Sequence, residues 1–301
     1  MAVYTPGVLT AHAELEKEGI TLPGYECGNR PLRIALVNLM PLKEMTETDF
    51  LRILSAMPVD IELMLVAPAT HRSRNTSADY IEAHYIDPEA MLALQPDGVI
   101  ITGAPVEKIP FEEVDYWTEL TAMIDALAAT SIPTLYICWA ALAGIYHFHG
   151  IGKQQYDRKI SGVFPHRAAT TPADPILRGM DDVFYVPHSR YCGVSMSEAA
   201  ESMSLVTVAT GEGSGLYIAR AKDLPNYYVT GHSEYAPGTL DFEYHRDLDK
   251  GINPDIPMNY YPDNNPDNRP EIKWRGQAHL LFVNWLGMVL AHRACNNTYL
   301  K

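Results

Sequence analysis

The chain has 301 residues, 47% of them hydrophobic and 20% charged, which is the composition of an ordinary globular protein. Its formal net charge of −14 argues against nucleic acid as a partner, because phosphate binding relies on clustered Lys and Arg. The amino-terminal segment has no basic start before an apolar stretch, and no apolar run is long enough for a bilayer. We therefore expect a cytoplasmic protein with no membrane partner.

The four cysteines are scattered along the chain and form no C-x-x-C pair: Cys27, Cys138, Cys192 and Cys295. This pattern favours free thiols in a reducing compartment over a disulfide framework. For the same reason the sequence predicts no zinc site, and we expect no bound metal.

Short apolar runs alternate with helical periodicity in the first half of the chain. The runs 32–38, 61–67, 98–103 and 134–138 predict strands buried on both faces, and 44–57 and 111–129 predict helices between them. This order predicts an α/β fold, with an open, mostly parallel sheet and helices on both faces.

The second half is less regular. Segments 183–188, 205–210, 215–220 and 226–232 predict shorter strands in an antiparallel extension. Residues 258–275 are rich in Pro, Asn and Asp and predict a surface loop, and 276–293 predict a final helix. We expect a single domain over 1–301, with an amino-terminal arm (1–30), an α/β core (31–240) and a carboxyl-terminal loop and helix (241–301).

Cys138 ends the apolar run TLYIC, and the residues after it, WAALAG, favour a helix. Enzymes of the α/β class carry a nucleophile at such a corner, because the tight turn exposes the side chain beside free backbone N–H groups. The helix N-terminus also favours a thiolate. A buried structural cysteine is the commoner occupant of such a position, so Cys138 alone does not decide the matter.

A second apolar strand ends in VTGHSEY, which presents His232 and Glu234 two residues apart. In an extended segment these side chains share a face, so they can pair while His232 reaches Cys138. A cysteine nucleophile needs a base, and the base needs an acid to orient it. The alternative, a solvated histidine beside a surface glutamate, stays open on these residues alone.

The segments C-W-A-A-L-A-G and G-H-S-E-Y together resemble the class I glutamine amidotransferase-like fold. Within that fold the chain resembles the homoserine O-acyltransferase family of methionine biosynthesis. The resemblance covers nearly the whole chain through blocks in the family's order: 38–52 (NLMPLKEMTETDFLR), 101–117 (ITGAPVEKIPFEEVDYW), 187–190 (PHSR), 259–262 (NYYP) and 274–286 (WRGQAHLLFVNWL). Several long blocks are far more specific than one motif.

The resemblance implies roles for the matching positions. Cys138 is then the acyl-thioester nucleophile, His232 the general base and Glu234 its orienting partner. Lys159, Ser189 and Arg246 match substrate-binding positions, and Arg246 can take an amino-acid carboxylate with two hydrogen bonds. Without the resemblance, a surface charge or a turn residue is the better interpretation of these three.

The resemblance also implies the reaction and its partners. We expect ping-pong acyl transfer from an acyl-coenzyme A through Cys138 to the hydroxyl of homoserine, with the backbone N–H of Trp139 binding the oxyanion. The partners are small molecules, no cofactor is tightly bound, and a homodimer is implied.

Glu107, in GAPVEK, matches the position that the family associates with the choice of acyl donor. A carboxylate there would repel the free carboxylate of a succinyl group. Like charges at about 4–5 Å would cost a few kcal/mol at moderate dielectric. The sequence therefore predicts acetyl-CoA as the donor, with succinyl-CoA as the alternative.

Four positions depart from the family's usual residues. Ala140 and Leu142 stand where glycine and glutamine are usual, Ser233 replaces a proline, and Pro165 replaces a glutamate. The changes after Cys138 keep serine or another hydroxy amino acid open as the acceptor. Glutamine amide hydrolysis with the same three residues and a non-catalytic metabolite-binding protein are further alternatives.

Overall fold

The computed structural model describes residues 2–22, 31–71, 73, 75–171 and 173–298. Cys27 lies outside these ranges, while Cys138, Cys192 and Cys295 are free thiols, as expected. No helix within the ranges combines the length and the apolar character needed to cross a bilayer.

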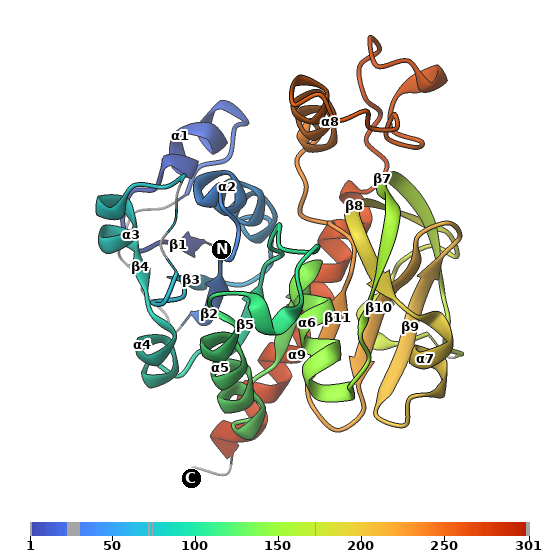
Figure 1. The fold of residues 1–301 in the computed structure, drawn as a ribbon. Coiled ribbons are helices and arrows are strands. Elements are labelled where there is room, and N and C mark those ends of the chain that lie inside the picture. Colours follow the sequence, from blue (N-terminus) through green and yellow to red (C-terminus); the bar gives the residue numbers. More distant parts are fainter. Residues whose placement is uncertain (1, 23–30, 72, 74, 172, 299–301) are drawn as a thin grey trace.

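The strands are β1 (Val3–Tyr4), β2 (Leu32–Val37), β3 (Ile61–Val66), β4 (Tyr85–Ile86), β5 (Gly98–Ile101), β6 (Thr134–Ile137), β7 (Lys153–Ala168), β8 (Phe184–Val194), β9 (Leu205–Gly211), β10 (Gly215–Ala221) and β11 (Asn226–Val229). Within the described part of the chain they form one 11-stranded sheet in the order β1-β3-β2-β5-β6-β11-β10-β9-β7-β8, with β4 paired to β3. The pairings from β1 to β11 are parallel, whereas β10, β9, β7 and β8 pair antiparallel (Figure 1). The predicted α/β class, with its antiparallel extension, is confirmed.

The α-helices are α1 (Thr10–Lys17), α2 (Lys43–Leu54), α3 (Ala78–His84), α4 (Pro88–Ala93), α5 (Trp117–Ala129), α6 (Trp139–His149), α7 (Met196–Glu201), α8 (Thr239–Asp249) and α9 (Arg275–Thr298), and 3₁₀ turns lie at η1 (Phe111–Glu113), η2 (Pro175–Leu177) and η3 (Pro262–Asn264). Buried residues of α1, α2 and α9 belong to one apolar cluster, and those of α4, α5 and α6 belong to another. Alternate residues of β2 enter the two clusters, because successive side chains of a strand point to opposite faces. The central strands are therefore covered by helices on both faces.

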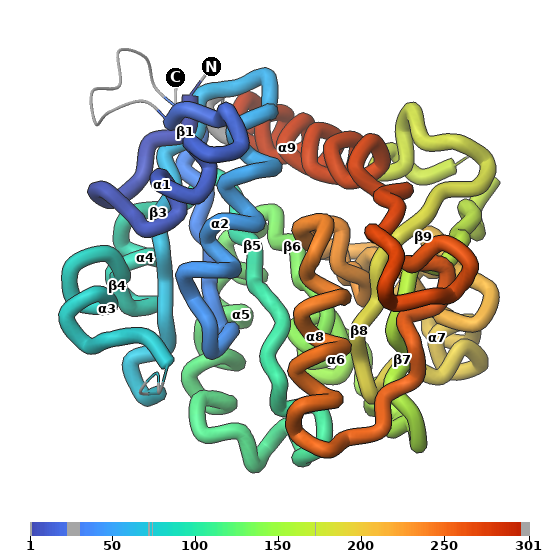
Figure 2. Tube along the Cα trace, turned by 90° about the horizontal axis from the view of Figure 1, so that it is seen from above, coloured from blue at the N-terminus to red at the C-terminus, as the bar shows by residue number. Residues whose placement is uncertain are grey.

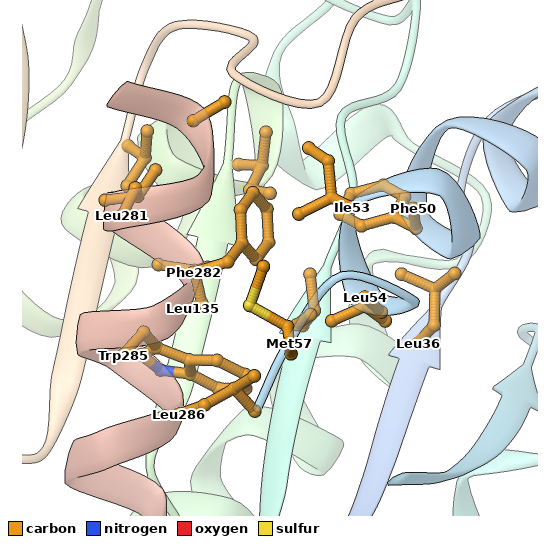
Figure 3. Packing of buried hydrophobic residues seen from close by; sticks show 14 of the residues in the cluster. Leu36, Phe50, Ile53, Leu54, Met57, Leu135, Leu281, Phe282, Trp285 and Leu286 are labelled. Atoms are coloured by element: carbon orange, nitrogen blue, oxygen red, sulfur yellow. The ribbon is translucent and has the colours of Figure 1, made fainter. Parts of the chain in front are cut away.

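The first apolar cluster holds α2 and α9 together across one face of the sheet (Figure 3). Phe50 of α2 meets Phe282 of α9 edge-to-face, with ring centroids 6.1 Å apart. Trp285, one turn further along α9, is fully buried, and its ring reaches the backbone position of Gly98 in β5. The carboxyl-terminal helix is thus part of the core.

The helix predicted over 111–129 is wrong for its first six residues. Phe111 begins a 3₁₀ turn, Val114 is extended, and α5 starts only at Trp117. The Phe111 ring stacks on Trp117 and Tyr146, with centroids 5.4 and 4.9 Å away. This aromatic packing requires a turn between Phe111 and Trp117, so tertiary contacts override the helical period.

The segment from α8 to η3 rises above the carboxyl ends of the parallel strands (Figure 1), and Figure 2 looks down on it. It is fastened to β7 at Gly162, where Met258 N–H donates to Ser161 O and Val163 N–H donates to Met258 O. A side chain on Gly162 would lie 2.4 Å from the Met258 backbone, so only glycine permits this approach. The rising segment faces the strand ends where the predicted catalytic residues lie.

Candidate active site

Cys138 occupies a strained corner between β6 and α6. Its φ of 52° and ψ of −116° are unusual for a residue with a side chain, and the residue as a whole is 7% exposed. Its backbone N–H donates to Val229 O at 2.7 Å, which ties the corner to the end of β11. Strain of this kind persists where the surroundings impose it, and it is common at catalytic nucleophiles.

His232 and Glu234 follow β11, the parallel neighbour of β6, so all three side chains meet at one edge of the sheet. Nδ1 of His232 lies 2.6 Å from Oε1 of Glu234, and both side chains are buried. Burial alone would lower the pKa of His232, but the charges of Cys138 and Glu234 and hydrogen bonds to both raise this pKa well above its usual value. The arrangement favours the imidazolium form of His232 beside Glu234.

Contacts from several elements hold the loop that carries this pair. Thr230 Oγ1 donates to Leu216 O at 2.5 Å, and the Tyr217 hydroxyl lies 2.9 Å from Ser233 Oγ. Trp274 Nε1 donates to Tyr235 O at 3.1 Å. Ser233, which replaces the usual proline, is thus fixed by a buried hydrogen bond.

The structure leaves space for a small anionic oxygen beside Cys138. Trp139 is the first residue of α6, and an N–H group there has no acceptor within its own helix. Gly103, which follows β5, lies next to Cys138 and Trp139. A Cβ atom added to Gly103 would lie 3.1 Å from Cβ of Cys138 and 3.7 Å from the Trp139 nitrogen. Its missing side chain leaves room for a carbonyl oxygen next to the Trp139 N–H.

Glu107 lies in the loop after β5 and is held against β8. Its Oε1 accepts from the Tyr191 backbone N–H at 3.1 Å and lies 4.0 Å from Sγ of Cys192. Burial raises the pKa of Glu107, although the Tyr191 N–H and the charges of His232, Lys159 and Arg190 oppose the shift. The charge of His232 therefore acts on this carboxylate.

Two of the predicted substrate-binding residues meet at a carboxylate that the sequence prediction missed. Lys159 Nζ donates to Oε2 of Glu243 at 3.1 Å, and the Ser189 hydroxyl donates to the same oxygen. The Tyr235 hydroxyl donates to the other oxygen at 3.1 Å, and its ring stacks on His232 at 4.2 Å. Tyr235 thus lies between Glu243 and His232 and contacts both.

Arg246, the third predicted substrate-binding residue, lies on the same helix as Glu243, and its side chain is 37% exposed. Its Nε and Nη2 donate to Oδ1 of Asp247 at 3.0 and 2.8 Å, and Lys159 Nζ lies 3.3 Å from Oδ2. Burial would raise the pKa of Asp247, but Arg246 and Lys159 lower it. The sequence did contain a sign that Glu243 belongs with these residues. Arg246 and Asp247 follow it by three and four positions, and this spacing puts the three side chains on one face of a helix.

Ala140 and Leu142, which replace the family's usual glycine and glutamine after Cys138, lie in an apolar environment. Ala140 and Leu142 are 1% and 3% exposed and belong to the cluster that α6 buries. An amide at position 142 would need a buried partner, so leucine suits this helix. Nothing in the structure explains Pro165. Within the described ranges, no three His, Cys, Asp or Glu side chains are grouped to hold a metal ion.

The mostly parallel sheet, with a strained cysteine after one strand and a His–Glu pair after its neighbour, has the class I glutamine amidotransferase-like fold. A glutamine amidotransferase from Thermotoga maritima shares the fold with a TM-score of 0.57 at 11% identity, covering 87% of this chain and 99% of that chain. A glutamine amido transferase from Methylobacillus flagellatus aligns with a TM-score of 0.52 at 13% identity, covering 85% of this chain and 94% of that chain.

The chain belongs to the family described as Homoserine O-succinyltransferase, whose sequence profile matches residues 5–295. It is 48% identical over 290 residues to the Homoserine O-acetyltransferase of Bacteroides thetaiotaomicron, covering 95% of both chains. The protein of that name from Shouchella clausii is 42% identical over 290 residues, covering 95% of this chain and 94% of its own. The predicted family is confirmed, and membership makes the chain an acyltransferase that acts on small molecules.

Proposed function

We propose that the protein is a homoserine O-acetyltransferase that uses acetyl-CoA and works in the cytoplasm. The observation that carries the proposal is Cys138 at its strained corner with the His232–Glu234 pair beside it. Relatives named homoserine O-acetyltransferase, which match over most of the chain, support the choice of substrates.

The first half-reaction moves the acyl group onto the enzyme. The Cys138 thiolate attacks the thioester carbonyl, and the oxyanion that forms accepts a hydrogen bond from the Trp139 N–H. The carbon–sulfur bond to coenzyme A then breaks, and the His232 imidazolium protonates the leaving thiolate. An acyl-cysteine and neutral His232 remain.

In the second half-reaction the homoserine hydroxyl attacks the acyl-cysteine. His232 removes the hydroxyl proton, a second oxyanion forms at the same site, and the Cys138 thiolate leaves. Glu234 keeps Nδ1 of His232 protonated and stabilises the imidazolium in both halves. Because Tyr235 stacks on His232 and reaches Glu243, the acceptor site lies on the Tyr235 side of the base.

The charges around Glu243 suit a zwitterionic amino acid. We assign the acceptor's ammonium group to Glu243, and its carboxylate to Arg246 and Lys159. Ser189 joins the same group of contacts through Glu243. This complementarity favours acceptors that carry both charges, because each charge then gains a charge-assisted hydrogen bond.

Glu243→Gln is expected to raise KM for homoserine by about 10- to 100-fold, because a charge-assisted hydrogen bond to the ammonium is lost. The first half-reaction, measured as acetylation of Cys138 by acetyl-CoA in the absence of acceptor, should change little. Asp249→Asn, an exposed change on the last turn of the same helix, serves as the control. Equal losses in both half-reactions would refute the assignment.

A donor-by-acceptor assay tests the proposal directly. Acetyl-CoA and succinyl-CoA are each offered with homoserine and with serine, and ester formation is followed together with thiol release. Acetyl-CoA with homoserine should give the highest kcat/KM. A preference for serine would support the alternative acceptor, and glutamate release from glutamine would favour amide hydrolysis. The homodimer implied by the family stays a prediction.

A further inference from the structure

His188 of β8 is a fully buried histidine beside the loop that carries the general base, and the mechanism above does not use it. Its ring lies against Gly231, the residue before His232: a Cβ atom added to Gly231 would lie 3.0 Å from both Cε1 and Nε2 of His188. On the same strand, Pro187 O accepts the backbone N–H of His232 at 2.8 Å. Two neighbouring residues of β8 therefore contact the backbone that carries the base.

Arg190 fixes one side of the His188 ring. Its Nε donates to Nδ1 of His188 at 3.3 Å. Its Nη1 donates to Cys192 O at 2.7 Å, and its Nη2 donates to Ser214 O. Because an arginine keeps all its protons in a protein, Nδ1 of His188 must present a lone pair to it. The single proton of neutral His188 is therefore on Nε2.

His166 of β7 fixes the other side of the ring. Nε2 of His188 lies 3.0 Å from Nε2 of His166, and the two rings stack with centroids 5.0 Å apart. Since His188 donates this hydrogen bond, His166 must accept it, and the proton of His166 is on Nδ1, which donates to Phe164 O at 2.9 Å. The Ser214 hydroxyl, 3.0 Å from Nε2 of His166, donates to the same lone pair. The hydrogen bonds thus run in one direction from Arg190 to Phe164 O.

This chain of hydrogen bonds forms only while both histidines are neutral. A second proton on His188 would point from Nδ1 at the Arg190 N–H, and a second proton on His166 would point from Nε2 at the His188 N–H. Burial lowers the pKa of His166 to about 4 and the pKa of His188 well below its usual value, and the charge of Arg190 adds to both shifts. The His188 ring is therefore held in one orientation and one protonation state at neutral pH.

We infer that His188 is a positioning residue: its ring, fixed on both sides, holds the backbone at Gly231 and thereby places the His232 imidazole for proton transfer beside Cys138. A shift of about 1 Å at a catalytic group can cost about 100-fold in rate, so such a support affects turnover without contacting the substrate. The inference rests on the proposed roles of Cys138 and His232 and not on the identity of the donor or the acceptor.

His188→Phe tests this role, because it keeps a ring beside Gly231 and removes both hydrogen bonds of the histidine. Since His232 acts in both half-reactions, acetylation of Cys138 by acetyl-CoA and its deacylation by homoserine should slow together by about 10- to 100-fold. KM for homoserine should change by less than about threefold, because the acceptor's contacts are intact. Unchanged rates, or a loss confined to KM, would overturn the inference.

His166→Phe tests the chain of hydrogen bonds one ring further from Gly231. It removes the acceptor for His188, so the same two rates should fall together by a smaller factor, and wild-type rates in this variant would contradict the inference. His149→Phe is the matched control. It removes another histidine whose pKa burial lowers to about 4 and which lies 3.0 Å from the Tyr228 hydroxyl, so it should lower thermal stability and leave both rates unchanged.

Histidine ¹⁵N NMR of the wild-type protein gives a further readout if neither variant folds. Scalar coupling across the N–H···N hydrogen bond identifies the pair, in which His188 should carry its proton on Nε2 and His166 on Nδ1. A charged His188 at neutral pH, or one with its proton on Nδ1, would overturn the inference. Failure of wild-type Cys138 to be acetylated by acetyl-CoA would instead refute the proposed function, whatever the tautomers show.

Discussion

Cys138→Ala is expected to abolish acyl transfer, with kcat/KM reduced by about 10⁴-fold or more. Without the thiol no covalent acyl-enzyme forms, and homoserine would have to attack the thioester directly. The oxyanion site and the bound geometry would then supply only the residual rate. The measurement is thiol release from acetyl-CoA in the presence of homoserine.

Cys192→Ala is the matched control for this experiment. Cys192 is a buried thiol whose Sγ lies 4.0 Å from Glu107, and burial raises its pKa far above the usual range, so it stays protonated. This variant should keep most of its activity. After mixing with acetyl-CoA alone, intact mass should show one added acetyl group in wild type and in Cys192→Ala, and none in Cys138→Ala. Transfer by Cys138→Ala at near the wild-type rate would remove the basis of the mechanism.

The position of Cys138 and His232 at one edge of the sheet was predictable from the apolar strands that precede them. The runs ending at Cys138 and before His232 are short, apolar and bounded by turn residues, and they form the neighbouring parallel strands β6 and β11. Since carboxyl ends of parallel strands meet at one edge, their terminal residues had to lie together. The strain at Cys138 was not visible, because it depends on tertiary contacts.

The longest strand was missed for a physical reason. β7 begins with KQQYDRKI, a polar segment whose residues are mostly exposed or half-buried, so it shows no apolar pattern. Its partner β8 supplies the pairing, with register shifts between Gln155 and Ile160. Lys159 lies within this irregular stretch, and so its side chain could not be placed from periodicity.

The proposed acceptor site is built from contacts between segments that are distant in the sequence. Glu243 meets Lys159 and Ser189 across 84 and 54 residues of sequence. The family resemblance predicted substrate-binding roles for Lys159, Arg246 and Ser189, but it did not name Glu243, the carboxylate that Lys159 and Ser189 contact. The spacing of charged residues on one helix predicts which of them share a face. Which residues of other segments contact that face depends on the tertiary fold.

Glu107→Gly is expected to reverse the preference for the acyl donor. The carboxylate of Glu107 accepts a hydrogen bond from the Tyr191 N–H. In the proposed function its negative charge would repel the free carboxylate of a succinyl group. Removing a repulsion of a few kcal/mol, together with the side-chain volume, should raise the succinyl-to-acetyl ratio of kcat/KM by about 10²- to 10³-fold. Parallel assays with the two donors and homoserine give this ratio. Glu113→Gln, an exposed change on the same segment, should leave it unchanged.

The same carboxylate predicts how donor choice in wild type depends on pH. Burial raises the pKa of Glu107, so its exclusion of succinyl is complete well above that pKa and is lost as pH falls through it. As pH falls, the discrimination against succinyl-CoA should therefore begin to weaken at a higher pH than it would for a glutamate whose pKa is not raised. Glu107→Gln keeps the size but has no proton to gain, so its donor ratio should not vary with pH in this way. If wild type and Glu107→Gln give the same ratio at neutral pH, volume rather than charge selects the donor.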